Sequence, residues 1–151
     1  SGAREWLKPL KLVSGTVLNA YENWTDDNEI YNEDARATDD PDGDGKNNVY
    51  EWGLGGDPSD SADIGITDVY GSYDGTFMVY VHPILKGSDD ERPTYQIIEA
   101  DDLILANWGD TLNATSQEGG AWPGHTNDFN AMTNWIPVAK DYNFFQLDIK
   151  E

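Results

Sequence analysis

The sequence predicts a mostly β protein, a β-sandwich preceded on its N-terminal side by a short, acidic helical motif. From residue 64 onward, short apolar segments alternate with clusters of Gly, Asp, Asn and Ser, which is typical of a sandwich of antiparallel strands. Before residue 64 the apolar segments are fewer and acidic residues are concentrated. The chain has 151 residues and no cysteine, so it is long enough to bury one core without disulfides.

This pattern divides the chain into three regions. Residues 1–19 alternate loosely between polar and apolar side chains, and we expect a linker or a strand that packs on the domain. Residues 20–63 form the acidic motif, and residues 64–151 form the sandwich. Within the motif we expect one short helix in Tyr21–Ala37 and a second over Asn47–Leu54. The second helix ends at Gly55-Gly56, because glycine readily adopts the left-handed conformation that follows a helix.

Short apolar runs define the expected strands. Alternation is clearest in Phe77–Val81 and Phe145–Ile149, where every second side chain can face one core. The glycine-rich segment Asn113–Thr133 is expected to be a long loop, and loops of that length are usually functional or disordered. The six expected strands are Ile64–Tyr70, Thr76–His82, Thr94–Glu99, Leu103–Trp108, Trp135–Lys140 and Phe144–Ile149.

The protein is strongly acidic, with 29 Asp and Glu against 9 Lys and Arg and a net charge of −20. Nucleic acids bind proteins mainly through Lys and Arg contacts with phosphates, so a nucleic-acid partner is excluded. Repulsion also disfavours an anionic membrane, and no stretch has the ~18 apolar residues of a membrane span. Between Tyr21 and Asp63 there are 14 acidic and 2 basic residues. Such a density destabilises a compact fold unless cations neutralise it.

One acidic segment has the spacing of a calcium-binding loop. Asp40, Asp42 and Asp44 occupy loop positions 1, 3 and 5, and Glu51 occupies position 12. Calcium binds six to eight oxygen atoms, and this EF-hand-like spacing offers three Asp side chains and one bidentate Glu. Gly45 at position 6 permits the sharp turn that the loop requires. The sequence therefore predicts a calcium site that helps the motif to fold.

Two further positions complete the expected ligand set. The carbonyl oxygen of Lys46 lies at position 7, and Asn48 at position 9 is expected to bind through water. Magnesium fits less well, because it avoids sites made entirely of protein ligands. A turn that is acidic by chance remains the alternative, although it requires neither alternating Asp residues nor an acid at position 12. The expected metal ligands are Asp40, Asp42, Asp44, Lys46, Asn48 and Glu51.

The segment Asp40–Pro58, with its Asp-Gly-Asp-Gly and Glu-Trp-Gly-Leu-Gly-Gly-Asp-Pro, resembles the calcium loops of dockerins and thrombospondin type 3 repeats. It is most similar to the version that precedes a C-terminal β-domain in large secreted bacterial proteins. That β-domain is matched loosely by Thr94–Leu103, Trp108, Met132–Asn134 and Phe144–Leu147. Dockerins carry two loops and this chain has one, which argues against docking to a cohesin.

The resemblance implies a function as well as a fold. Modules of this kind often accompany domains that degrade polysaccharides, so we expect a secreted or extracellular, non-catalytic, carbohydrate-binding accessory module. Its implied partners are a polysaccharide ligand and a catalytic domain of the same polypeptide. The first alternative is a calcium-stiffened spacer or attachment domain without a glycan ligand. A small glycosidase is the second, and it needs two carboxylates facing each other, from pairs such as Asp89-Asp90 or Asp101-Asp102.

Aromatic side chains are the candidate glycan contacts, because sugar rings stack on flat aromatic surfaces. Trp122 lies between Gly119-Gly120 and Pro123-Gly124, where little nearby can bury an indole. Exposure of Trp122 favours glycan binding, and burial favours the spacer. The net charge of −20 favours a neutral or weakly charged glycan. The expected glycan contacts are Trp122, His125, Trp108, Trp135 and Arg92.

Overall fold

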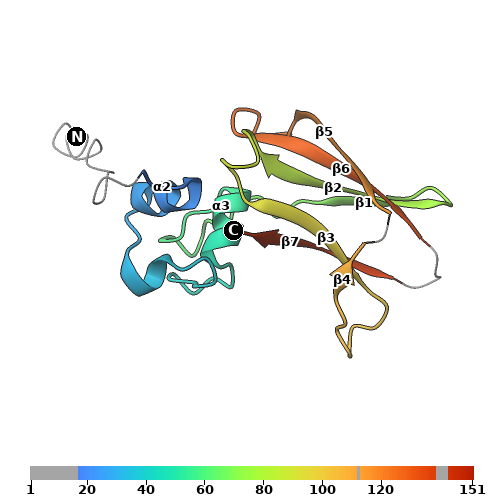
Figure 1. Ribbon diagram of the computed structural model, residues 1–151, viewed down its shortest axis with the longest axis horizontal. Coiled ribbons are helices and arrows are strands. Elements are labelled where there is room, and N and C mark those ends of the chain that lie inside the picture. The colour runs from blue at the N-terminus through green and yellow to red at the C-terminus, as the bar shows by residue number, and fades with distance from the viewer. Residues whose placement is uncertain (1–16, 112, 139–142) are drawn as a thin grey trace.

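The computed structural model describes residues 17–111, 113–138 and 143–151. Its regular structure is mainly two antiparallel sheets, preceded by two short α-helices and a 3-10 turn (Figure 1). The expectation of a mostly β chain is confirmed. The linker or strand predicted for residues 1–19 lies outside the described residues, apart from its last three positions.

The first helix, α2 (Ala20–Asp27), starts at a reciprocal cap. The Asn19 side chain accepts the backbone N–H of Glu22, and the Glu22 carboxylate accepts the N–H of Asn19, both at 2.8 Å. Tyr21 is buried, and its hydroxyl donates to the carbonyl of Ala35 at 3.0 Å. This bond ties α2 to the 3-10 turn η2 (Asn32–Ala35). Within the acidic motif, α2 and η2 are therefore joined before the loop Asp40–Glu51 begins.

The second helix, α3 (Asn48–Leu54), attaches the motif to the sheets. Its C-terminal residue is followed by Gly55 at φ +74°, as the sequence predicts. Val49, Trp52 and Leu54 are buried in the main core, which confirms that this helix docks by its apolar face. The Asn47 side chain caps the helix by accepting the N–H of Tyr50.

Two sheets enclose the core and face each other in Figure 1, with α3 at one shared end. The four-stranded sheet has the order β1 (Tyr70–Tyr73), β2 (Phe77–Leu85), β6 (Phe129–Pro137), β5 (Thr115–Ala121). The three-stranded sheet has the order β4 (Gly109–Asp110), β3 (Thr94–Ala100), β7 (Phe144–Lys150). Tyr80 and Ile136 from the first sheet pack with Ile97, Leu147 and Ile149 from the second. Both sheets and α3 therefore share one hydrophobic core.

Tyr95 links the two sheets and α3 through its side chain. Its hydroxyl donates to the carbonyl of Gly53 in α3 at 2.6 Å and accepts the N–H of Leu85 in β2 at 3.1 Å. Because Tyr95 itself belongs to β3, one side chain joins α3 to a strand of each sheet. Burial raises the pKa of this phenol far above its usual range, so it remains a neutral donor.

The prediction of a strand over Ile64–Tyr70 is wrong except at its last residue. The N–H of Ile66 donates to the carbonyl of Leu54 at 2.8 Å, so this segment packs against the end of α3 instead of pairing with a strand. Gly65 has φ +71°, and a side chain there would clash with the carbonyl of Leu54. Ile66 is buried against Trp122 and Phe129 in a second, smaller core.

The prediction of a strand over Leu103–Trp108 is also wrong, because this segment is a turn. The Asp102 carboxylate accepts the N–H groups of Ile104 and Leu105 and replaces the partners that a sheet would supply. Ala106 has φ +48°, which is incompatible with an extended strand. The three apolar side chains that suggested a strand, Leu103, Ile104 and Leu105, are exposed.

The segment Asn113–Thr133, expected to be a loop, is largely a β-hairpin made of β5 and the first half of β6. Every residue of β5 is exposed and its sequence has no large apolar side chain, so no alternation marks it. A register shift between Glu118 and Ala121 coincides with Gly119-Gly120. The strand expected at Trp135–Lys140 begins earlier and ends at Pro137. The remaining three expected strands match β2, β3 and β7 to within a few residues.

Candidate metal centre

Three aspartates of the acidic loop gather their carboxylates at one point. One oxygen each from Asp40, Asp42 and Asp44 lies within 4.8 Å of the others. Backbone N–H groups of the loop hold them there: Gly43 and Gly45 donate to Asp40 at 2.9 Å, and Asp42 accepts the N–H of Asp44 at 3.2 Å. Gly43 and Gly45 have φ of +76° and +93°, conformations that glycine adopts without strain. The loop is therefore shaped by its own backbone.

In the acidic loop and in the neighbouring helix α3, several carboxylate oxygens are buried without a hydrogen-bond donor among the described residues. Glu51 is 0% exposed, and within the described residues neither of its carboxylate oxygens has a partner. One Oδ2 atom each of Asp42 and Asp44 is also buried and unpartnered. Buried carboxylates normally accept hydrogen bonds, and leaving them without donors is costly. A hard cation with six to eight oxygen ligands would satisfy them, so this donor set fits calcium.

The electrostatics agree with this geometry. Burial, together with the charges of Asp42, Asp44 and Asp40, raises the pKa of Glu51 to about 8. Burial raises the pKa of Asp42 as well, although the hydrogen bond from the Asp44 N–H opposes this, and the negative charges of Asp44 and Asp40 add to the rise. The nearest basic residue in the loop, Lys46, has its ammonium group over the ring of Tyr50. The cluster thus carries a concentration of like charge that a divalent cation would neutralise.

Asn48, the residue at loop position 9, has a structural role that the sequence did not reveal. It is fully buried, and its side-chain amide donates to the carbonyls of Asp34 at 2.6 Å and Arg36 at 2.9 Å. These bonds fix the start of α3 to η2 and to Arg36, the residue that follows it. Its Oδ1 has no partner among the described residues. Its role as a water-mediated metal ligand, and that of the Lys46 carbonyl at position 7, remain predictions.

Two more acidic residues belong to this neighbourhood and were missed from the sequence. Asp39, directly before the loop, has a buried and unpartnered Oδ2. Asp57, beyond the end of α3, adds to the charges that raise the pKa of Glu51. The only sequence signal for either was the local excess of acidic residues. A local excess of acidic residues does not tell which of them lie beside the metal centre and which are simply exposed to solvent.

The expected glycan contact Trp122 does not lie on the surface. It is 2% exposed and packs with Ile66, Phe129 and the ring of Tyr70, whose centroid is 5.5 Å away. The expectation of an outward-facing platform is therefore wrong. Ile66, which the sequence placed in a distant strand, covers the indole. Burial makes Trp122 an anchor of the turn between β5 and β6.

The other expected glycan contacts do not form one surface. His125 is exposed on the same turn as Trp122, with its ring 6.2 Å from that of Phe129. Trp135 is half-buried on β6, and Trp108 is half-buried after the turn that precedes β4. Arg92 lines a cleft between the two sheets, and only 10% of its side chain is exposed. The structure groups only Trp122 with His125.

Comparison of the chain with protein-family models, with curated proteins and with solved structures finds no match. The resemblance to dockerin and thrombospondin type 3 loops stays a prediction based on the residues of the loop. No helix in the described parts of the chain is long and apolar enough to cross a membrane.

Proposed function

We propose that the chain is a calcium-stabilised, non-catalytic accessory module of a secreted polysaccharide-degrading protein, and that it acts first as a structural or attachment domain. In this proposal an EF-hand-like loop organises the helical motif at the end of a β-sandwich. The observation that carries it is the fully buried Glu51, whose two carboxylate oxygens have no donor among the described residues and whose pKa is raised by the charges of three loop aspartates.

Four carboxylates would hold the ion. Asp40, Asp42 and Asp44 would bind it from the loop, and Glu51 would close the site from α3. A bound calcium ion supplies positive charge that neutralises these carboxylates. Because Glu51 lies between Val49 and Trp52 of the buried helix, closing the site also fixes α3 against the core. Metal binding and packing of the motif are therefore coupled.

A glycosidase is disfavoured by the acidic groups near the cleft. Asp89 and Glu118 both contact Arg92 at 3.0 Å. A general acid in such an enzyme needs a raised pKa. The pKa of Glu118 is lowered, first by its hydrogen bond from Asn130 and then by Arg92. Asp102 is engaged in capping its own turn.

Thermal unfolding with calcium and with a chelator tests the proposal. A ligand at a free concentration of about 100 times its Kd stabilises the folded state by about 2.7 kcal/mol, so calcium should raise the Tm by several degrees. Glu51→Gln should remove most of this increase, because an amide is a poorer ligand. The matched control is Glu33→Gln, which removes one charge from the exposed η2 turn and should retain the full calcium effect. Identical melting curves of the unsubstituted protein with calcium and with chelator would refute the proposal.

A further inference from the structure

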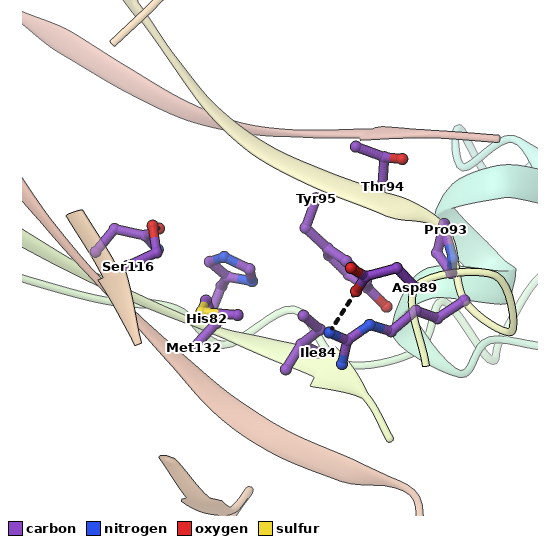
Figure 2. Close-up of a pocket in the computed structure, with 10 residues that line it drawn as sticks. His82, Ile84, Asp89, Pro93, Thr94, Tyr95, Ser116 and Met132 are labelled. Atoms are coloured by element: carbon purple, nitrogen blue, oxygen red, sulfur yellow. Dashed lines mark hydrogen bonds and ion pairs between the residues drawn. The ribbon is translucent and has the colours of Figure 1, made fainter. Parts of the chain in front are cut away.

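A cleft of about 300 Å³ lies between the two sheets. Its walls come from β2, β5 and β6 of one sheet, from β3 of the other, and from the segment that joins β2 to β3 (Figure 2). Its volume is at the lower end of the range for small-molecule sites. The cleft is distinct from the metal centre, with which it shares no lining residue.

Polar side chains line this cleft where the facing strands would otherwise bury apolar ones. His82 on β2 is 1% exposed and Asn134 on β6 is 6% exposed, yet both line the cavity. Asn134 donates to the carbonyl of Tyr80 at 3.1 Å and accepts from the Ser116 hydroxyl at 2.6 Å. The His82 ring lies against that of Tyr95, with centroids 5.6 Å apart and an angle of 22° between the planes. These contacts hold the polar wall rigidly before any ligand arrives.

The imidazole of His82 offers an acceptor to the cleft. Its Nδ1 lies 2.8 Å from the carbonyl of Pro83, and a carbonyl only accepts, so Nδ1 carries the proton. Burial lowers the pKa of His82, which keeps the ring neutral at ordinary pH. Nε2 is then an unprotonated acceptor, and no hydrogen bond of the described residues involves it. A ligand that complements this wall must bring a donor.

Charge restricts the ligand class further. The only cation of the cleft, among the described residues, is Arg92, which is held by Asp89, Glu118 and the carbonyl of Leu85, each at 3.0 Å. With its charge balanced in this way, Arg92 is not available to bind an anion. The net charge of −20 adds repulsion to any anionic ligand. Ile84 and Met132 add apolar surface beside these polar groups.

We infer that this cleft binds one neutral sugar unit, with a sugar hydroxyl donating to Nε2 of His82 and C–H groups of the ring packing on Ile84 and Met132. A sugar matches the cleft because it combines hydroxyl donors with apolar C–H faces and carries no charge. Figure 2 shows His82 between Ser116 on one side and Tyr95 on the other, and all three line the cavity. The inference adds a ligand to the proposed structural module and does not depend on calcium.

Nitrogen NMR of the histidines tests this directly, because the chain has only His82 and His125. The probes are the methyl glycosides of D-glucose, D-galactose, D-mannose and D-xylose at millimolar concentration. At least one should shift the Nε2 resonance of His82 saturably and leave His125, exposed on the β5–β6 turn, unchanged. Glucosamine, which carries a positive charge, is the comparison probe. No saturable shift of His82 with any glycoside, equal shifts of both histidines, or a shift with glucosamine alone would each overturn the inference.

Two variants locate the binding site. His82→Phe keeps an aromatic ring beside Tyr95 and removes the acceptor, so calorimetry should show at least a tenfold loss of affinity for the bound glycoside. Trp135→Ala is the control, because Trp135 follows Asn134 on β6 and points to the opposite face of that sheet, and affinity should be unchanged. Binding that survives in His82→Phe and disappears in Trp135→Ala would place the sugar on the outer face and contradict the assignment. If His82→Phe does not fold, the NMR result on the unsubstituted protein decides.

Discussion

The acidic loop and the inter-sheet cleft both bury polar groups, and they satisfy them in opposite ways. In the loop, both oxygens of Glu51 and one each of Asp42 and Asp44 have no donor among the described residues. In the cleft, Asn134 is hydrogen-bonded at both ends of its amide, and Arg92 is balanced by two carboxylates. Within the described residues, no basic side chain forms an ion pair with these loop carboxylates, whereas the one cation of the cleft is paired with two carboxylates.

This difference indicates what each region can bind. A set of buried carboxylates without donors is stabilised by a cation, and its folded form depends on that cation. A preformed cleft with a neutral acceptor is stable without a ligand, and its ligand gains affinity because the walls need no reorganisation. Loss of calcium should therefore leave the folded protein with uncompensated buried charge, whereas an empty cleft should not.

The largest expected effect comes from replacing Glu51 with an apolar residue of similar size. Glu51→Leu removes a buried, unpaired acid, so the chelated protein should be at least as stable as the unsubstituted protein. In saturating calcium the same variant should be about 3 kcal/mol less stable than the unsubstituted protein, because α3 no longer supplies a carboxylate ligand to the metal. Denaturant unfolding in calcium and in chelator measures both values. A variant that is destabilised equally in both conditions would show that Glu51 is a structural residue and not a ligand.

A smaller, pH-dependent effect is expected in the cleft. Burial lowers the pKa of His82 below 6.5, so the folded state resists protonation more than the unfolded state does. Stability from this residue is complete above pH 6.5 and is lost as the pH falls below that value, at about 1.4 kcal/mol for each unit of pKa difference. Tyr80 and Tyr95 lie against the ring, and the hydrogen bond to the carbonyl of Pro83 opposes part of the effect of burial.

Comparison of the unsubstituted protein with His82→Phe isolates the contribution of His82 to the pH dependence of stability, because titration of the loop carboxylates is common to both. Tm values in saturating calcium between pH 8 and pH 5 should fall more steeply for the unsubstituted protein. Parallel curves would mean that His82 is protonated as readily in the folded as in the unfolded chain.

The smallest expected effect is that of Ser116→Ala. The substitution removes the bond from the Ser116 hydroxyl to Asn134, which keeps its bond to Tyr80, so the cost should be about 0.5–1 kcal/mol. Ser116 lies on β5, at the edge of the sheet and away from α3, so its cost should be the same with calcium and with chelator. If the loss of unfolding free energy differs between calcium and chelator by more than that amount, the acidic loop and the Ser116 side of the cleft are energetically coupled.

The sequence predicted the parts of the molecule in which one local pattern decides the structure. The loop spacing identified Asp40, Asp42 and Asp44 as a group, and Gly55 marked the end of α3, because both features depend on nearby residues. Glu51 is buried near these aspartates, whose charges raise its pKa, and its role as a ligand stays a prediction. Apolar alternation identified β2 and β7 for the same reason.

Features that depend on distant contacts were not predictable. β5 has no large apolar side chain, and only its pairing with β6 makes it a strand. The Leu103–Leu105 run was misread for a local reason, because the adjacent Asp102 side chain makes it a turn. Trp122 is buried by Ile66, which is far away in the sequence. The cleft was missed entirely, because no spacing reveals that His82, Tyr95 and Asn134 meet between two sheets.

The hydroxyl of Tyr95 gives the two regions a common element. It holds the carbonyl of Gly53 in α3, two residues after Glu51, while its ring lies against His82 in the cleft. Any movement of α3 on loss of calcium would therefore be transmitted to one wall of the cleft. Thermodynamic linkage is reciprocal, so the factor by which calcium strengthens sugar binding equals the factor by which sugar strengthens calcium binding. A module seated on its polysaccharide would then keep its metal, and its fold, at calcium concentrations that would empty the free protein.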